Sequence, residues 1–123
     1  MDQVFSNELR LNLLVTALEG GSNYWYWIKT EEYPKLEKKL EGELPFCEAL
    51  LDYILEENSI EIYDIEDIDY RLGYISLDNM SFAERELEFN YPDIYESIIE
   101  ETYDANDADA WFQLVVMKEI IFG

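Results

Sequence analysis

Hydrophobic residues recur three and four positions apart in several stretches of the first half of the chain, which is the spacing of a buried helix face. Ser6 stands where it can cap the first of these stretches, and Gly20-Gly21 ends it. Pro34 and Pro45 stand ahead of the next two, in the first-turn position that proline favours. The pattern therefore predicts helices over residues 4–18, 34–40 and 45–55.

The spacing changes to the alternation of a strand between residues 59 and 77. Apolar and polar residues alternate on both sides of Glu66-Asp67-Ile68-Asp69, a segment rich in residues that form turns. These features predict a β-hairpin with its turn at this segment. Large aromatic residues also alternate over residues 22–28, which indicates a short strand or a packed loop.

Three further helices are predicted after the hairpin. Ser81-Phe-Ala-Glu84 matches the capping box, in which the serine oxygen accepts a hydrogen bond from the glutamate amide and the glutamate reaches back. Pro92 is suited to begin the next helix. Asp104 or Asp107 is expected to cap a last helix that runs to about Ile121, because acceptors near a helix start satisfy its free amides.

The composition is that of a folded domain. The chain has 123 residues, of which 49% are hydrophobic and 15% aromatic, so it can bury a core without disulfides or metals. No linker or repeat divides it. We therefore expect one α+β domain over residues 1–123, mostly helical, with about five to six helices and a central β-hairpin or small antiparallel sheet.

The net charge of the chain and its distribution are unusual for a domain of this size. The chain has 29 acidic and 8 basic residues, for a net charge of −21. Residues 56–109 hold 18 carboxylates against only Arg71 and Arg85, so 16 of the 21 net negative charges fall in this segment. Such a surface repels nucleic acid and anionic lipid and attracts basic proteins. A solubility surface or a salt-adapted host is the simpler explanation, but a uniform coat would not be this uneven.

Several kinds of chemistry are excluded by the residue types. The chain has no histidine, so it cannot build histidine-dependent triads or histidine-ligated zinc or haem sites. Cys47 is its single cysteine and is read as a small buried hydrophobe. The segment from Asp104 to Asp109 begins like a calcium loop but lacks the required glycine and final glutamate, so helix capping explains its aspartates better. We expect no enzyme activity, no metal and no cofactor.

The compartment follows from the same residues. The start of the chain lacks a basic segment, and no apolar run approaches the roughly 18 residues of a membrane span. With no disulfide to form, the chain is expected in a reducing cytoplasm, without a membrane partner.

Acidic residues of the second half fall in pairs at helical spacing. Glu84 and Glu88 lie four residues apart, as do Glu96 and Glu100, so each pair repels by a few tenths of a kcal/mol. A repulsive pattern favours a role in which these side chains, with the acids of the hairpin turn, imitate the phosphates of a nucleic acid. Solvated helix faces without a partner are the alternative. The predicted partner-binding face consists of Asp64, Glu66, Asp67, Asp69, Glu84, Glu88, Asp93, Glu96, Glu100 and Glu101.

An aromatic cluster follows Gly20-Gly21. Rings this close together are more often core than ligand platform, so packing is the first interpretation. The alternative is a stacking pocket for a planar ligand. Its predicted residues are Asn23, Tyr24, Trp25 and Gln113, with the two amides fixing the orientation of the ligand.

Both ends of the chain resemble a family of small proteins encoded by bacteriophages and prophages. The resemblance rests on Leu18-Glu-Gly-Gly-Ser-Asn-Tyr-Trp25 near the start, on Asp104-Ala-Asn-Asp-Ala-Asp109, and on Gln113 followed by Glu119-Ile120 and a terminal glycine. It implies phage origin but no assigned activity. Asp107 stands where the family pattern has threonine, and Lys118 where it has glycine, so a pocket built on those positions would be altered here.

These observations lead to one main hypothesis. Small acidic phage proteins are often inhibitors of host defence, so the chain is expected to block the nucleic-acid-binding site of a basic host protein in the host cytoplasm, such as a CRISPR effector or a restriction nuclease. Direct binding of nucleic acid is not expected, because the charges repel. A sponge for a nucleotide defence signal and a phage structural or regulatory protein remain alternatives, and a homodimer is left open.

Overall fold

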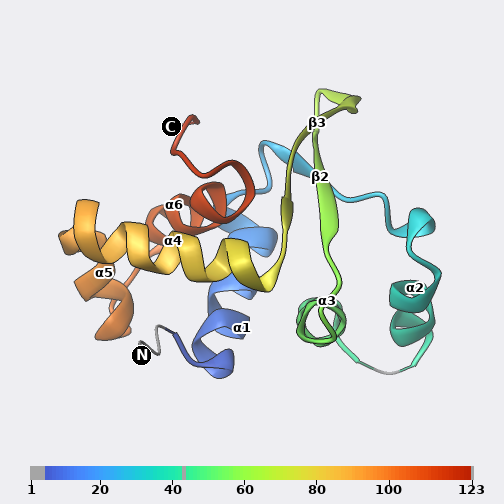
Figure 1. Cartoon of the computed structure of the whole chain (residues 1–123), viewed down its shortest axis with the longest axis horizontal. Coiled ribbons are helices and arrows are strands. Elements are labelled where there is room, and N and C mark those ends of the chain that lie inside the picture. The colour runs from blue at the N-terminus through green and yellow to red at the C-terminus, as the bar shows by residue number, and fades with distance from the viewer. Residues whose placement is uncertain (1–4, 43, 123) are drawn as a thin grey trace.

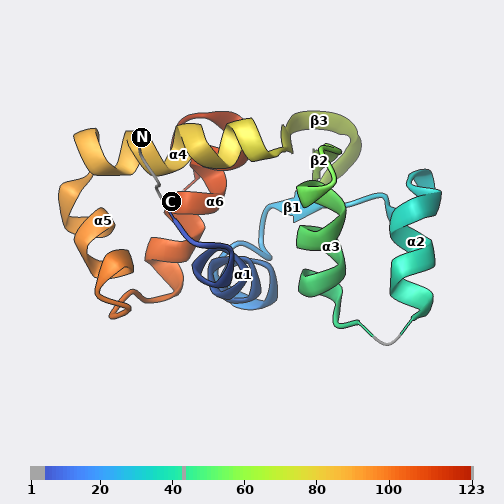
Figure 2. The same cartoon turned by 60° about the horizontal axis from the view of Figure 1, so that its bottom comes forward.

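The computed structural model describes residues 5–42 and 44–122 of the chain (Figure 1). Its elements in chain order are α1 (Asn7–Thr16), the π-helical turn η1 (Ala17–Gly21), β1 (Tyr26–Trp27), the 3-10 turn η2 (Thr30–Glu32), α2 (Pro34–Glu41), α3 (Phe46–Leu55), β2 (Ile60–Asp64), β3 (Asp67–Ile75), α4 (Leu77–Asn90), α5 (Pro92–Ile99) and α6 (Ala105–Met117). Figures 1 and 2 show α1, α4, α5 and α6 clustered on one side of the sheet, with α2 and α3 on the other. This mostly helical α+β architecture confirms the predicted fold class.

Most helices begin where local signals place them. The Ser6 hydroxyl accepts a hydrogen bond from the Leu9 amide at 3.1 Å and caps α1. Asp104 caps α6 by accepting from the Asp107 amide at 2.9 Å, while the Asp107 carboxylate accepts from the Asp104 amide at 3.3 Å. These starts are confirmed because a capping contact needs only residues three positions apart. Val4, where the first predicted helix begins, lies outside the described residues.

The capping box predicted at Ser81-Phe-Ala-Glu84 is wrong. Helix α4 begins earlier, after Ser76, whose hydroxyl accepts a hydrogen bond from the Asn79 amide at 3.1 Å. Ser81 and Glu84 therefore lie inside the helix, where the backbone amides already have partners. The helix starts after Ser76 because this residue directly follows β3, at the point where the chain leaves the sheet.

The three strands form one antiparallel sheet in the order β1-β2-β3. Tyr26 of β1 pairs with Asp64 of β2, and Ile60 of β2 pairs with Ile75 of β3. Within the aromatic segment 22–28, Tyr26 and Trp27 form a short strand, and residues 22–25 form a bend and turn before it. The hairpin turn lies at residues 65–66, earlier than predicted, because the Asp64 carboxylate accepts a hydrogen bond from the amide of residue 66 at 2.8 Å and closes the turn there.

Helix α6 is the centre of the core. It contacts α1, η1, α4, α5 and β3, and its residues 108–116 are all buried. Two glycines let the backbone of other elements reach it. A Cβ at Gly21 would clash with the Ala105 carbonyl oxygen, and a Cβ at Gly73 would clash with the Val116 carbonyl oxygen. Glycine is therefore required at both contacts.

Helix α6 ends at Met117, short of the predicted end near Ile121. Lys118 follows it with φ 66°, a left-handed conformation in which glycine is the usual residue. This is the position at which the phage-family pattern has glycine. The reversal turns the last residues back along α6.

Candidate functional site

Asp109 on α6 is a buried carboxylate surrounded by four hydrogen-bond donors. Its Oδ1 accepts from Ser22 Oγ at 2.6 Å and from Trp25 Nε1 at 2.8 Å. Its Oδ2 accepts from the Tyr24 hydroxyl at 2.8 Å and from Gln113 Nε2 at 3.1 Å. Only 7% of Asp109 is exposed, and all four donors are neutral. Asp109 therefore ties the segment after η1 to α6. The prediction that it caps a helix is wrong, because it lies beyond the first turn.

Gln113 extends this network to the end of the described chain. Its Oε1 accepts hydrogen bonds from the amides of Ile121 and Phe122, each at 2.8 Å, and its Nε2 donates to the Phe122 carbonyl at 3.0 Å. The Phe122 ring then stacks on Trp25 with centroids 5.4 Å apart. Asp109, Gln113 and Trp25 thus hold three separate segments together.

The predicted ligand pocket does not form as one site. Trp25 is buried, with 2% of its surface exposed, and lines neither of the two clefts at which the other predicted residues lie. Tyr24 and Gln113 line a cleft of about 430 Å³ beside Asp109, whereas Asn23 lines a different cleft next to β1. In the first cleft, the polar atoms of Gln113 are already bonded to Asp109 and to the chain end. The amide that was expected to orient a ligand therefore has a structural role.

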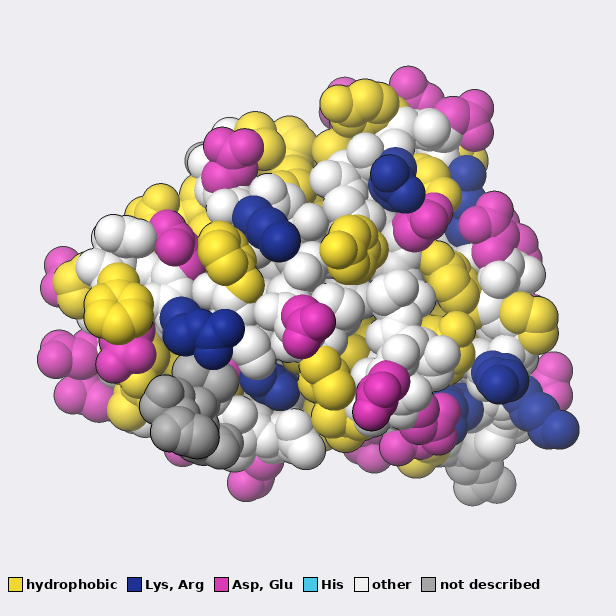
Figure 3. Space-filling model, in the orientation of Figure 1, with side chains coloured by type: hydrophobic (Ala, Val, Ile, Leu, Met, Phe, Trp, Pro, Cys, Tyr) yellow, Lys and Arg dark blue, Asp and Glu magenta, His cyan; other side chains and the backbone are white. Residues whose placement is uncertain are grey.

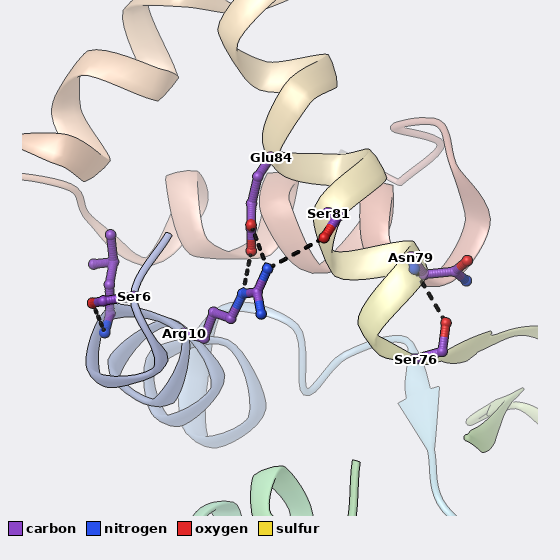
Figure 4. A network of polar contacts seen from close by, with 7 residues as sticks. Ser6, Arg10, Ser76, Asn79, Ser81 and Glu84 are labelled. Atoms are coloured by element: carbon purple, nitrogen blue, oxygen red, sulfur yellow. Dashed lines mark hydrogen bonds and ion pairs between the residues drawn. The ribbon is translucent and has the colours of Figure 1, made fainter. Parts of the chain in front are cut away.

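Glu84 does not belong to the predicted acidic face, because it is fully buried. Figure 4 shows it facing Arg10 of α1. Arg10 Nε and Nη2 donate to Glu84 Oε2 and Oε1, both at 2.8 Å, and Nη2 lies 3.5 Å from Ser81 Oγ. Burial raises the pKa of the Glu84 carboxyl, and the Arg10 guanidinium opposes this shift. The pair joins α1 to α4 and offers no charge to a partner.

The other nine predicted acids fall into two separate groups. The first, named here the hairpin patch, consists of Asp64, Glu66, Asp67 and Asp69. The second, named the α5 patch, adds the exposed N-cap of α6 to the five remaining predicted acids and consists of Glu88, Asp93, Glu96, Glu100, Glu101 and Asp104. Helix α4, about 21 Å long, begins next to β3 and ends next to α5, so the two patches lie at different ends of the molecule (Figures 1 and 2).

Arg85 on α4 is exposed and stands three residues before Glu88, on the border of the α5 patch, but among the described residues it makes no ion pair with the patch. Lys29 lies over the Tyr63 ring and 3.8 Å from Asp69 of the hairpin patch. Lys39 pairs with two acids of α3 and its end, and Arg71 pairs with Glu61. None of the ion pairs that lysine or arginine makes in the described residues involves the α5 patch. Residues 86–117 contain nine carboxylates and no lysine or arginine.

Neither a metal-binding group of side chains nor a membrane-spanning helix occurs in the described parts of the chain. No group of three or more aspartate, glutamate or cysteine side chains there is placed to hold a metal ion. None of the helices in residues 5–42 and 44–122 has the length and apolar character needed to cross a membrane.

Comparison with protein-family models, curated proteins and solved structures finds no match to this chain. The resemblance to phage-encoded proteins therefore stays a prediction that rests on the motif residues themselves. In the structure these residues meet around one carboxylate: Ser22, Tyr24 and Trp25 from the first motif contact Asp109 from the second, and Gln113 completes the set.

Two tyrosines with raised pKa values make the fold sensitive to alkali. Burial raises the pKa of Tyr26 from 10.0 to about 12, and the neighbouring Cys47 and Glu19 add to the shift. Burial and the Asp109 carboxylate also raise the pKa of Tyr24 to about 12. The folded state therefore holds more protons than the unfolded state between these values, so stability should fall as pH rises through that interval. Burial also raises the pKa of the Cys47 thiol from 9.0 to about 11, so the fall begins near pH 9.

Urea unfolding at increasing pH, with tyrosinate absorbance measured in parallel, tests this expectation. Tyr26→Phe should lose stability less steeply with rising pH than the wild type, because one of the shifted groups is gone. If all ten tyrosines titrate together near the ordinary value, the expectation is wrong.

Proposed function

We propose that this protein is an inhibitor that binds a basic host protein through the α5 patch and covers that protein's nucleic-acid-binding surface. The observation that carries the proposal is the run from residue 86 to 117, which lies between Arg85 and Lys118, contains no lysine or arginine, and places six exposed carboxylates at one end of the molecule. A nuclease of a restriction or CRISPR system has the required complementary surface, because it must bind the phosphates of its substrate. The phage-family resemblance supports a target of this kind.

Three acids of the α5 patch, Glu96, Glu100 and Glu101, occupy positions that cost stability. Glu96 and Glu100 repel each other at a spacing of four residues. Glu100 and Glu101 stand at the C-terminal end of α5, where the helix macrodipole disfavours negative charge. Glu101 also has φ 58°, in the left-handed region that disfavours a side chain. Each of these three residues carries one or two unfavourable terms and has no structural partner for its side chain in the described chain, so binding explains them better than folding.

An apolar side chain accompanies the charge. Phe89 at the end of α4 is 76% exposed, more than any other large hydrophobic residue in the described chain. It directly follows Glu88 of the α5 patch, and Figure 3 shows acidic and hydrophobic side chains next to each other at this end of the molecule. A partner with an apolar pocket inside a basic surface would match both features, since buried aromatic anchors supply most of the binding energy at protein interfaces.

Capture of the target from host lysate, followed by competition, tests the proposal. The tagged protein should retain a basic nucleic-acid-binding protein at about 50 mM salt and release it at about 500 mM, because exposed charges are screened. Duplex DNA should also release it. A variant that removes four of the patch charges should weaken capture by about tenfold or more and change stability little, since the repulsion that is removed offsets the loss of the Asp93 charge from the first turn of α5. Its substitutions are Asp93→Asn, Glu96→Gln, Glu100→Gln and Glu101→Gln.

A second variant controls for total charge. It removes four exposed carboxylates from other elements and so has the same net charge as the first variant. Its substitutions are Glu8→Gln, Glu31→Gln, Glu48→Gln and Glu57→Gln. We expect this variant to capture the target like the wild type. Equal loss of binding in both variants would show that charge as a whole, and not the α5 patch, attracts the partner. Release of a nucleotide from the heated protein, with no captured protein, would favour the sponge instead.

A further inference from the structure

A second cleft lies beside the free edge of the sheet, away from the α5 patch. Its volume is about 340 Å³, and no charged residue lines it. Strand β1 and the residues next to it supply one wall, the start of α3 supplies another, and the turn between β2 and β3 supplies the rim. The lining residues are Asn23, Tyr26, Trp27, Ile28, Thr30, Phe46 and Ile65.

The strand beside this cleft is open for pairing. Strand β1 is at the edge of the sheet, and its ladder partner is β2. Among the described residues outside β2, none makes a backbone hydrogen bond with Tyr26, Trp27 or Ile28. An extended peptide can add to such an edge through main-chain hydrogen bonds, and its side chains then enter the pockets beside the strand.

Two apolar side chains at the cleft are exposed to solvent, and a bound partner would bury them. Trp27 is 44% exposed and Ile65 38% exposed, and both line the cleft. Tryptophan is among the residues that contribute most to binding when a partner buries it. An apolar side chain of the partner would be needed to cover these two.

The charge around the cleft is negative. Ile65 lies between Asp64 and Glu66 of the hairpin patch, and Asp64 pairs with Tyr26 across the sheet. Lys29, which lies between the lining residues Ile28 and Thr30 in sequence, is turned towards the Tyr63 ring and Asp69. A segment that enters the cleft therefore meets carboxylates at its rim, and basic residues on either side of its apolar side chain complement them.

We infer that this cleft binds an extended basic segment of a partner protein, with one large apolar side chain inserted between Trp27, Phe46 and Ile65. The backbone of the segment pairs with β1, and its lysine or arginine residues face Asp64 and Glu66. This site goes beyond the proposed function, because it uses neither the α5 patch nor Phe89. A segment of this kind binds here whether or not the α5 patch has a target.

Trp27 provides a direct probe of the cleft. The chain has three tryptophans, and Trp25 and Trp111 are buried, with 2% and 0% exposed. Quenching of fluorescence by acrylamide therefore reports mainly on Trp27. The synthetic peptide Lys-Arg-Phe-Lys-Arg should protect this tryptophan from quenching. The peptide with alanine in place of phenylalanine should bind about tenfold more weakly or worse, since the apolar contact is lost. Glu-Glu-Phe-Glu-Glu should give no protection.

Two substitutions in the same hairpin locate the effect. Ile65→Ala removes a lining residue, whereas Ile68→Ala removes a side chain of similar exposure, 45%, that does not line the cleft. We expect weaker peptide binding only for Ile65→Ala, with both variants folded by circular dichroism. The inference is overturned if Lys-Arg-Phe-Lys-Arg gives no protection up to about 1 mM. It is also overturned if the alanine or acidic peptide protects equally, or if Ile68→Ala weakens binding as much as Ile65→Ala.

Discussion

Asp109→Ala is expected to lower the free energy of unfolding by about 4 kcal/mol, because it leaves several buried donors without an acceptor. Ser22, Tyr24, Trp25 and Gln113 all donate to this one carboxylate. Hydrogen bonds to a charged acceptor are stronger than those between neutral groups, and an unpaired buried donor costs its full desolvation energy. Urea unfolding followed by circular dichroism measures the loss directly.

Two variants separate this effect from a simple loss of charge. Asp109→Asn keeps the shape of the side chain but points an amide N–H₂ at donors on one side. Its free energy of unfolding should therefore lie between those of the wild type and Asp109→Ala. Asp104→Ala removes the exposed cap of the same helix and should cost only about 1 kcal/mol. If Asp109→Ala costs no more than Asp104→Ala, the network does not hold the segments together in the way described.

The same network explains why the site differs from the one expected from sequence. The rings of the aromatic cluster and the amide of Gln113 are present as predicted, but their polar atoms are bonded to one another through Asp109. Sequence spacing places Ser22 and Asp109 87 residues apart, so no local pattern indicates that they meet. Only the close approach of η1 to the start of α6 at Gly21 brings them together.

Helix boundaries could be predicted where the signal is local. Caps at Ser6 and Asp104 and the proline at the start of α5 involve residues within one turn of each other, and they were predicted correctly. The start of α4 was not, since Ser76 and Ser81 are both able to cap and only the end of β3 decides between them. Ser76 and Ser81 carry the same local capping signal, so sequence alone does not choose between them.

The burial of Arg10 and Glu84 could have been predicted from their positions on the apolar stripes of α1 and α4. Arg10 stands three and four positions before Leu13 and Leu14, on the apolar stripe of α1. Glu84 stands next to Ala83 and three positions before Leu87, on the stripe of α4. A charged residue on an apolar stripe must find a partner when the helix packs. Glu84 was instead assigned to the predicted acidic face because it lies four residues before the exposed Glu88.

Arg10→Met is expected to destabilise the protein by about 3–5 kcal/mol, because it leaves the Glu84 carboxylate buried without its guanidinium partner. Both Arg10 hydrogen bonds to Glu84 are 2.8 Å long, and Glu84 has no exposed surface. The double variant with Glu84→Leu should recover most of the loss, to within about 1 kcal/mol of the wild type, since two apolar side chains fill the same space. A double-mutant cycle in urea measures the coupling between the two positions.

The pH dependence of the single variant distinguishes an unpaired carboxylate from a simple packing defect. Burial already raises the pKa of Glu84 above the ordinary value of 4.5, and loss of the opposing guanidinium raises it further. Between the ordinary and the raised value, the folded state holds more protons than the unfolded state, so stability grows as pH falls through this interval. The deficit of Arg10→Met relative to the wild type should therefore shrink on acidification, whereas that of the double variant, which has no carboxyl at position 84, should not shrink. A deficit that is the same at every pH would mean that lost packing, and not the buried charge, accounts for the instability.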